Sequence, residues 1–156
     1  SKNEILKEIQ VNKKEAYYYL DDTFGEVYYY SGNFKRYDFL SFFVKPSDSK
    51  YIIQSIFGII QYDKNIKQCY EKQKEIDIEL SSNYTNLKKK VGEHAHQVDP
   101  SGKSIVKYIY YYFDNNDLLR VECTKFEKNL KKKYGWSNGL SVSLVSNDVQ
   151  NWLSNY

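Results

Sequence analysis

The sequence contains two cysteines, Cys69 and Cys123, whose positions constrain the fold more than any other feature. Cys69 lies on the apolar side of a segment with helical periodicity, and Cys123 lies on the apolar side of a predicted strand. A helix that crosses this strand would bring the two Cα atoms within the separation of about 4.4–6.8 Å that a disulfide requires. We therefore predict a bridge, which would close a loop of about 54 residues and stabilise the fold by up to about 4 kcal/mol. Two separate buried thiols are the alternative.

The apolar periodicity of the chain predicts an α+β fold with one long helix. The helix is expected over about residues 63–80 or longer, with Asp63 as its N-cap. Short β patterns separated by turn residues predict an antiparallel meander of about six or seven strands, followed by a short C-terminal helix. Residues 1–15 are expected to form an amphipathic N-terminal arm, and residues 16–156 a single α+β domain. The apolar arc of the long helix comprises Ile66, Cys69, Tyr70, Ile76 and Leu80.

The clearest β-hairpin joins residues 104–113 to residues 118–126. A four-residue turn at 114–117 would pair Phe113 with Leu118 and so set the register of the two strands. On this register one face is apolar throughout and is expected to contact the long helix. It carries Val106, Tyr108, Tyr110, Tyr112, Leu119, Val121 and Cys123. The opposite face carries Lys107, Ile109, Tyr111, Phe113, Leu118, Arg120, Glu122 and Thr124.

This second face of the hairpin is too apolar for an ordinary solvated surface. One explanation is that the hairpin is central and covered on both sides, or buried by a partner chain. The functional explanation is an aromatic platform that stacks a sugar or a peptide. Tyr111 and Phe113 would supply the rings, and Arg120 opposite Tyr111 would add a hydrogen-bonding fork or a cation–π contact.

Two groups of lysines, at 88–90 and between residues 125 and 133, give the chain basic clusters. Tyr134 and Trp136 follow the second cluster, so lysine charge meets aromatic rings there, as in proteins that bind single-stranded nucleic acid. Trp136 is therefore a further binding candidate. The net charge of only +3 and the scarcity of arginine argue against nucleic acid as the partner.

The only two histidines, His94 and His96, lie in a His-x-His pattern that would place both rings on one side of an extended segment. Some zinc sites use this arrangement, but a metal would need a third ligand such as Asp99. A solvated loop is the plainer interpretation. His94 and His96 are accordingly weak metal candidates, and the sequence predicts no cofactor and no catalytic residue.

These observations predict a non-enzymatic, extracytoplasmic binding or interaction module, with an aromatic, lysine-bearing surface for a glycan, a peptide or a partner protein. The secreted or periplasmic location follows from the predicted disulfide. No apolar run is long enough for a transmembrane helix. Two alternatives remain: an intracellular lysine-rich binder of single-stranded nucleic acid, and a metal-dependent hydrolase that uses His94 and His96. The sequence leaves the oligomeric state and the identity of the ligand open.

Overall fold

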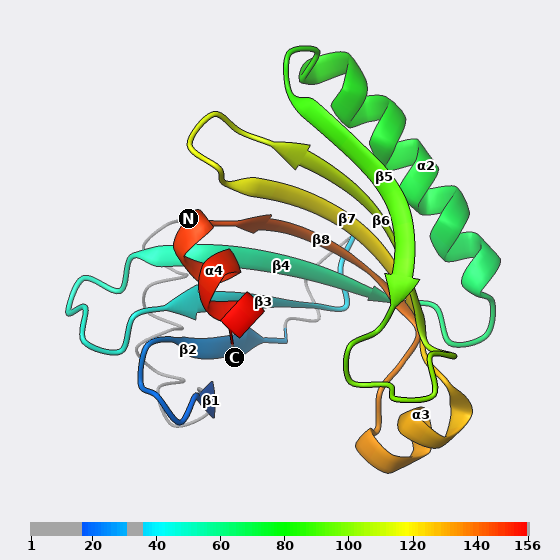
Figure 1. Ribbon diagram of the computed structural model, residues 1–156, viewed down its shortest axis with the longest axis horizontal. Helices are drawn as coiled ribbons and strands as arrows, with labels where there is room; N and C mark the ends of the chain where they lie inside the picture. The colour runs from blue at the N-terminus through cyan, green and yellow to red at the C-terminus, as the bar shows by residue number, and fades with distance from the viewer. Residues whose placement is uncertain (1–16, 31–35, 156) are drawn as a thin grey trace.

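The computed structural model describes residues 17–30 and 36–155, with the side chains of Tyr17 and Tyr18 left out. The predicted N-terminal arm, residues 1–15, lies outside the described residues. The described chain forms one antiparallel sheet with a long helix packed on it and a short C-terminal helix, which confirms the predicted α+β class (Figure 1). No helix in this described part is long and apolar enough to cross a membrane.

The sheet consists of two antiparallel meanders that join in its middle. The strand order is β1-β2-β3-β4-β8-β7-β6-β5, so β4 and β8 form the junction, and β5 is one of the two edge strands. The first meander comprises β1 (Tyr17–Tyr18), β2 (Gly25–Tyr29), β3 (Phe39–Val44) and β4 (Ile53–Gln61). The second comprises β5 (Lys88–Ala95), β6 (Ile105–Tyr112), β7 (Leu118–Lys125) and β8 (Gly139–Val145).

Helix α2 (Ile66–Asn83) connects the two meanders and covers one face of the second. Its N-cap is Asn65, whose side chain accepts the backbone N–H of Lys67 at 3.1 Å, so the prediction of Asp63 as the cap is wrong. Asp63 instead accepts hydrogen bonds from the Lys131 ammonium at 2.6 Å and from the backbone N–H of Asn138 at 2.9 Å. It therefore ties the start of the helix segment to the loop before β8 rather than capping the helix.

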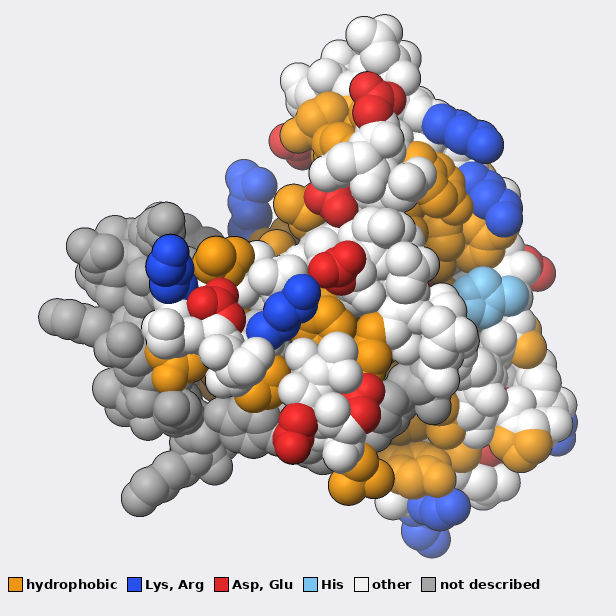
Figure 2. Space-filling view, turned by 60° about the vertical axis from the view of Figure 1, so that its left-hand side comes forward, with side chains coloured by type: hydrophobic (Ala, Val, Ile, Leu, Met, Phe, Trp, Pro, Cys, Tyr) orange, Lys and Arg blue, Asp and Glu red, His pale blue; other side chains and the backbone are white. Residues whose placement is uncertain are grey.

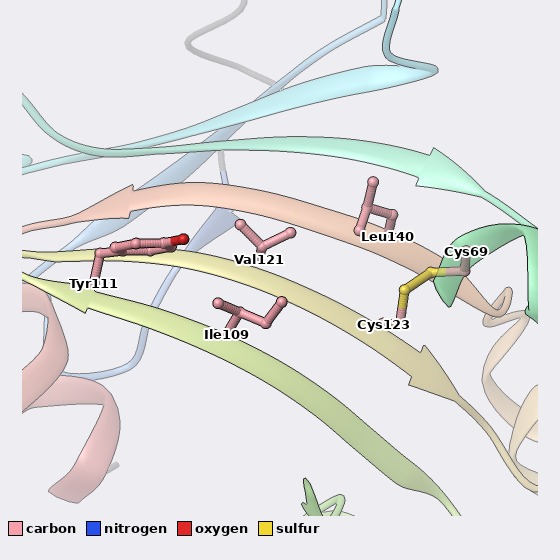
Figure 3. Packing of buried hydrophobic residues seen from close by; sticks show 6 residues of the cluster. All are labelled: Cys69, Ile109, Tyr111, Val121, Cys123 and Leu140. Carbon is pink, nitrogen blue, oxygen red and sulfur yellow. A yellow bond between two sulfur atoms is a disulfide. The ribbon is translucent and has the colours of Figure 1, made fainter. Parts of the chain in front are cut away.

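The predicted disulfide is present and joins α2 to β7. The Cα atoms of Cys69 and Cys123 are 6.0 Å apart, and both residues are fully buried. Figure 3 shows the bridge at one end of a cluster that runs along the sheet beneath the helix. The buried members of this cluster are Cys69, Ile109, Tyr111, Val121, Cys123 and Leu140. The bridge thus fixes the helix to the middle of the second meander.

The register of the β6–β7 hairpin differs from the predicted one by one residue. Tyr112, rather than Phe113, pairs with Leu118, and the backbone N–H of Phe113 donates to the carbonyl of Asp117 at 3.0 Å. The turn contains one more residue than predicted because Asn116 adopts a left-handed conformation with φ of 64°, a common solution in hairpins. A shift of one residue turns every side chain of a strand to the other face.

As a result, the predicted grouping of side chains on β6 is wrong. Ile109 and Tyr111 share the helix-covered face with Val121 and Cys123. The other face of the second meander carries the even-numbered residues of both strands: Val106, Tyr108, Tyr110 and Tyr112 from β6, and Leu118, Arg120, Glu122 and Thr124 from β7. We call this second face the open face.

A second core lies on the open-face side of the sheet, where α4 (Asn147–Asn155) packs. Val149 of this helix is fully buried, and Trp152 makes an edge contact with Phe24 at 5.2 Å between ring centroids. This is the C-terminal helix that the apolar pattern predicts. Helices α2 and α4 therefore lie on opposite faces of the sheet, and α4 packs on the side of the open face (Figure 1).

Two elements were not predicted. Strand β5 begins at Lys88, where the apolar pattern predicts a continuation of the long helix or a loop. Short helix α3 (Lys128–Tyr134) forms where the lysine-rich sequence predicts only a connecting segment. Most residues of β5 are exposed, so burial imposes no alternating pattern on the segment. Helix α3 is capped by the side chain of Glu127 and ends at Gly135, whose φ is 68°.

Candidate functional site

A groove of about 340 Å³ lies on the open face, between the second meander and α4. Its floor is formed by side chains of β6 and β7, and its walls are formed by the end of β5 and by α4. Its lining residues include His94, His96, Tyr110, Arg120, Glu122 and Gln150. On the right-hand side of Figure 2, hydrophobic side chains lie between Lys or Arg side chains and a histidine. The open face thus combines aromatic rings, the cationic Arg120, the anionic Glu122 and the neutral amide of Gln150.

Three tyrosines form a strip along β6, because every second residue of a strand points to the same face. The rings of Tyr108 and Tyr110 are stacked, with centroids 4.4 Å apart, and Tyr112 continues the strip at 6.5 Å from Tyr110. Gly92 on β5 pairs with Tyr108, and a Cβ at this position would lie 2.6 Å from the Tyr108 hydroxyl oxygen. The absence of a side chain at Gly92 therefore makes room for the ring. We call these three residues the tyrosine strip.

Arg120 and Glu122 lie on the groove floor beside the strip. The guanidinium carbon of Arg120 is 5.8 Å from the ring centroid of Tyr110, within the range of a cation–π contact. The hydroxyl of Tyr110 donates a hydrogen bond to the carboxylate of Glu122. Burial, followed by the charge of Glu122, raises the pKa of Tyr110 well above its ordinary value. Tyr110 is therefore a neutral donor that holds Glu122 in place.

The two histidines line the other side of the groove. His94 is exposed and its ring centroid lies 5.6 Å from that of Tyr108. His96 is half-buried, with its ring 5.0 Å from Phe126 and 5.9 Å from Trp136. Burial, and to a lesser degree the neighbouring His94, lowers the pKa of His96 below 6.5, so its imidazole is neutral at pH 7.

Asp99, the third metal ligand suggested by the sequence, has its carboxylate engaged in hydrogen bonds within a turn. Its carboxylate accepts hydrogen bonds from the Ser101 hydroxyl at 2.6 Å and from the Ser104 backbone N–H at 2.6 Å. These bonds hold the pKa of Asp99 far below its ordinary range. Among the residues that the structure describes, no group of three His, Cys, Asp or Glu side chains is placed to bind a metal.

The structure separates the residues of the predicted aromatic platform. Tyr111 is 1% exposed beneath α2, where its hydroxyl bonds to Asp77 at 2.6 Å, while Arg120 lies on the open face. Phe113 lies at the end of the hairpin, 6.1 Å from the ring of Tyr84. The register shift explains this separation, and Tyr110 takes the place beside Arg120 that was predicted for Tyr111.

Trp136 belongs to an aromatic cluster at the end of the groove that contains His96. Its ring stacks on Tyr134 at 4.7 Å and contacts Phe126 at 5.0 Å. Because Trp136 also contacts His96, which lines the groove, its fluorescence should report events there. Tyr110 and Gln150, which line the groove, and Tyr108, which stacks on Tyr110, are the residues that sequence reasoning missed, and only the correct hairpin register and the packing of α4 could have identified them.

Several lysines of the predicted basic clusters take part in ion pairs. Lys89 pairs with Asp77, and Lys131 pairs with Asp63 at 2.6 Å. Lys90 is the member nearest the tyrosine strip, with its ammonium 6.0 Å from the ring centroid of Tyr108. The lysines are thus distributed over both faces of the sheet rather than along one continuous track.

Comparisons with family models, with curated proteins and with solved structures give no match.

Proposed function

We propose that this protein is a non-enzymatic carbohydrate-binding module whose ligand lies in the groove and along the tyrosine strip. The observation that carries the proposal is the stacked pair Tyr108–Tyr110, which leads into a groove lined by the planar polar groups of Arg120, Glu122 and Gln150. A sugar ring offers an apolar C–H face and a rim of hydroxyls. Tyrosine rings pack against the C–H face, and planar polar side chains form hydrogen bonds with the hydroxyls.

The arrangement favours binding over catalysis. Glu122 is the one carboxylate that lines the described groove, and the hydroxyl of Tyr110 already occupies it. Hydrolysis of a glycosidic bond generally uses a pair of carboxylates that flank the bond. A groove with one engaged carboxylate and a neutral His96 supports recognition of a sugar rather than its cleavage.

We further propose that the protein acts outside the cytoplasm. Disulfides persist mainly in oxidising compartments, and the Cys69–Cys123 bridge lies in the principal core, where it contributes to stability. A secreted or periplasmic module that binds glycans would meet its ligands there.

The other candidate functions receive less support. A binder of single-stranded nucleic acid needs a continuous basic track, whereas Lys89 and Lys131 are engaged with carboxylates. A metal-dependent hydrolase would need a third ligand close to His94 and His96, and Asp99 is committed to its turn. Peptides and partner proteins remain ligand classes that the same binding assays can include.

The test is a screen on an array of neutral and charged glycans, followed by titration with the best ligand. Tyr110→Ala should weaken binding at least about tenfold, because it removes the central ring of the strip, whereas Tyr110→Phe should keep most of the affinity. Tyr84→Ala is a matched control, because Tyr84 is an exposed tyrosine that packs on Phe113 away from the groove. Absence of binding to any glycan, or equal affinity of Tyr110→Ala and the native protein, would refute the proposal.

A further inference from the structure

We infer that the sugar recognised in the groove is acidic, and that its carboxylate pairs with the guanidinium of Arg120. This inference rests on the proposed carbohydrate-binding function and specifies the class of ligand. It comes from an unusual feature of the groove floor, a partly buried positive charge whose hydrogen bonds are incomplete.

Arg120 lies on the central part of the open face, where water is partly excluded. Its side-chain Nε is buried and makes no hydrogen bond within the described part of the chain. Among the described residues, no carboxylate forms an ion pair with Arg120. By contrast, four lysines have their Nζ atom within 3.2 Å of a carboxylate oxygen. A buried donor without a partner destabilises the fold, and more strongly when the group is charged. Such a group is a natural place for an anionic ligand.

Ser143 supplies a second, independent observation on the same face. It pairs with Arg120 across β7 and β8, it is 2% exposed, and its hydroxyl also lacks a hydrogen-bond partner among the described residues. Residues opposite each other on neighbouring strands point to the same side of the sheet. An unsatisfied guanidinium N–H and an unsatisfied hydroxyl therefore lie at paired positions on the open-face side of the sheet, so this part of the open face has two donors that the described residues leave without a partner.

Arg120 and Lys90 are cations near this point, and Glu122 is the one carboxylate among the described residues that line the groove. Glu122, two residues from Arg120 on the same strand, accepts the hydroxyl of Tyr110. Lys90 projects toward the strip from β5, and His94 and His96 add no negative charge. The side chains of α4 that line the groove are all neutral: Gln150, Leu153 and Ser154.

The geometry of the ligand group follows from the chemistry of arginine. A guanidinium presents parallel N–H donors that match the two oxygens of a carboxylate. Tyr110, which contacts Arg120, would then stack the sugar ring that bears this carboxylate. A uronic acid, in which a carboxylate replaces the terminal hydroxymethyl group of the ring, has both features.

The experiment compares glucuronic acid with glucose and with methyl glucuronate, an ester that keeps the ring and removes the charge. The acid should bind at least about tenfold more tightly than either neutral sugar, because a charge-assisted pair is lost in both. Arg120→Gln should abolish this difference, and Arg120→Lys should reduce it. Arg36→Gln is the matched control, because Arg36, the chain's other arginine, lines a separate cavity beside α2.

NMR of the two arginine Nε–H groups provides a direct readout of the contact. Addition of glucuronate should shift the Arg120 signal and leave the Arg36 signal unchanged. If the native protein binds all three sugars equally, the inference is overturned while the proposed function stands. If acetate shifts the Arg120 signal as strongly as glucuronate does, and neither neutral sugar binds, Arg120 takes carboxylates but the carbohydrate proposal fails. If neither glucuronate nor acetate shifts the signal, the acidic-ligand inference is wrong.

Discussion

Reduction of the Cys69–Cys123 bridge should destabilise the protein by about 4 kcal/mol. The bridge joins residues separated by 54 positions in the sequence. For a loop of that length the chain-entropy relation gives about 14 cal/mol/K, which is about 4 kcal/mol at 25 °C. The bridge also fixes α2 to β7 at a place where both cysteines are fully buried, so its loss leaves the helix held by side-chain packing and by the polar contacts of Gln73 and Asp77. A loss of this size corresponds to a fall in Tm of roughly 8–16 °C.

The assay is urea unfolding followed by far-UV circular dichroism, with and without a phosphine reductant. Reduction keeps both sulfur atoms in the core, whereas the double variant Cys69→Ala/Cys123→Ala removes them. The double variant should therefore be less stable than the reduced native protein, and the difference measures packing rather than loop closure. Alkylation of the denatured, unreduced protein, followed by intact mass measurement, should find no reactive thiol.

Two outcomes would refute this reasoning. Two alkylated thiols in the unreduced protein would show that the bridge is absent and would remove the argument for an oxidising location. A change of less than about 1 kcal/mol on reduction would show that the loop closure does not restrict the unfolded chain as the entropy relation requires.

Further predictions concern a buried polar contact and a titrating side chain. Gln73→Ala should cost about 1–3 kcal/mol in urea unfolding, because the buried amide of Gln73 donates to the carbonyls of Lys107 at 2.9 Å and Val121 at 2.8 Å, and the change removes both bonds. Lys74→Ala, at an exposed helix position, should be nearly neutral. For His96, the folded-state pKa is lower than the ordinary 6.5, so the unfolded chain binds more protons in mild acid. Stability from neutral His96 should therefore be complete above about pH 6.5 and fall as the pH drops below it, by at most about 1.4 kcal/mol per pH unit. His96→Gln should flatten this part of the pH profile of the urea midpoint, and a profile identical to that of the native protein would contradict the assignment.

The sequence allowed the class of the fold, the long helix and the disulfide to be predicted, and the physical reason is the same in each case. Each of these predictions uses the periodicity of apolar residues within one helix or one strand, which does not depend on how the elements pair. Examples are the apolar arc of α2 and the alternating residues of β7: Leu119, Val121 and Cys123. Edge strand β5 could not be found in this way, because most of its side chains are in water and nothing requires them to alternate. The same holds for α3, in which no residue is buried.

The hairpin register shows why the candidate site was harder to predict than the fold. Residues 110–112 are all tyrosine, so composition cannot say which of them faces the helix. Which tyrosine faces the helix depends on hydrogen-bond partners that are distant in the sequence. The hydroxyl of Tyr111 bonds to Asp77 and Ser81 of α2, and the hydroxyl of Tyr110 donates to Glu122. A buried tyrosine needs such a partner, and only the assembled sheet provides it. Arg120 was nevertheless placed correctly on the face away from Cys123, because the two-residue period of β7 alone decides that. The shift by one residue changed its aromatic neighbour from Tyr111 to Tyr110, and with it the ring that a ligand of Arg120 would meet.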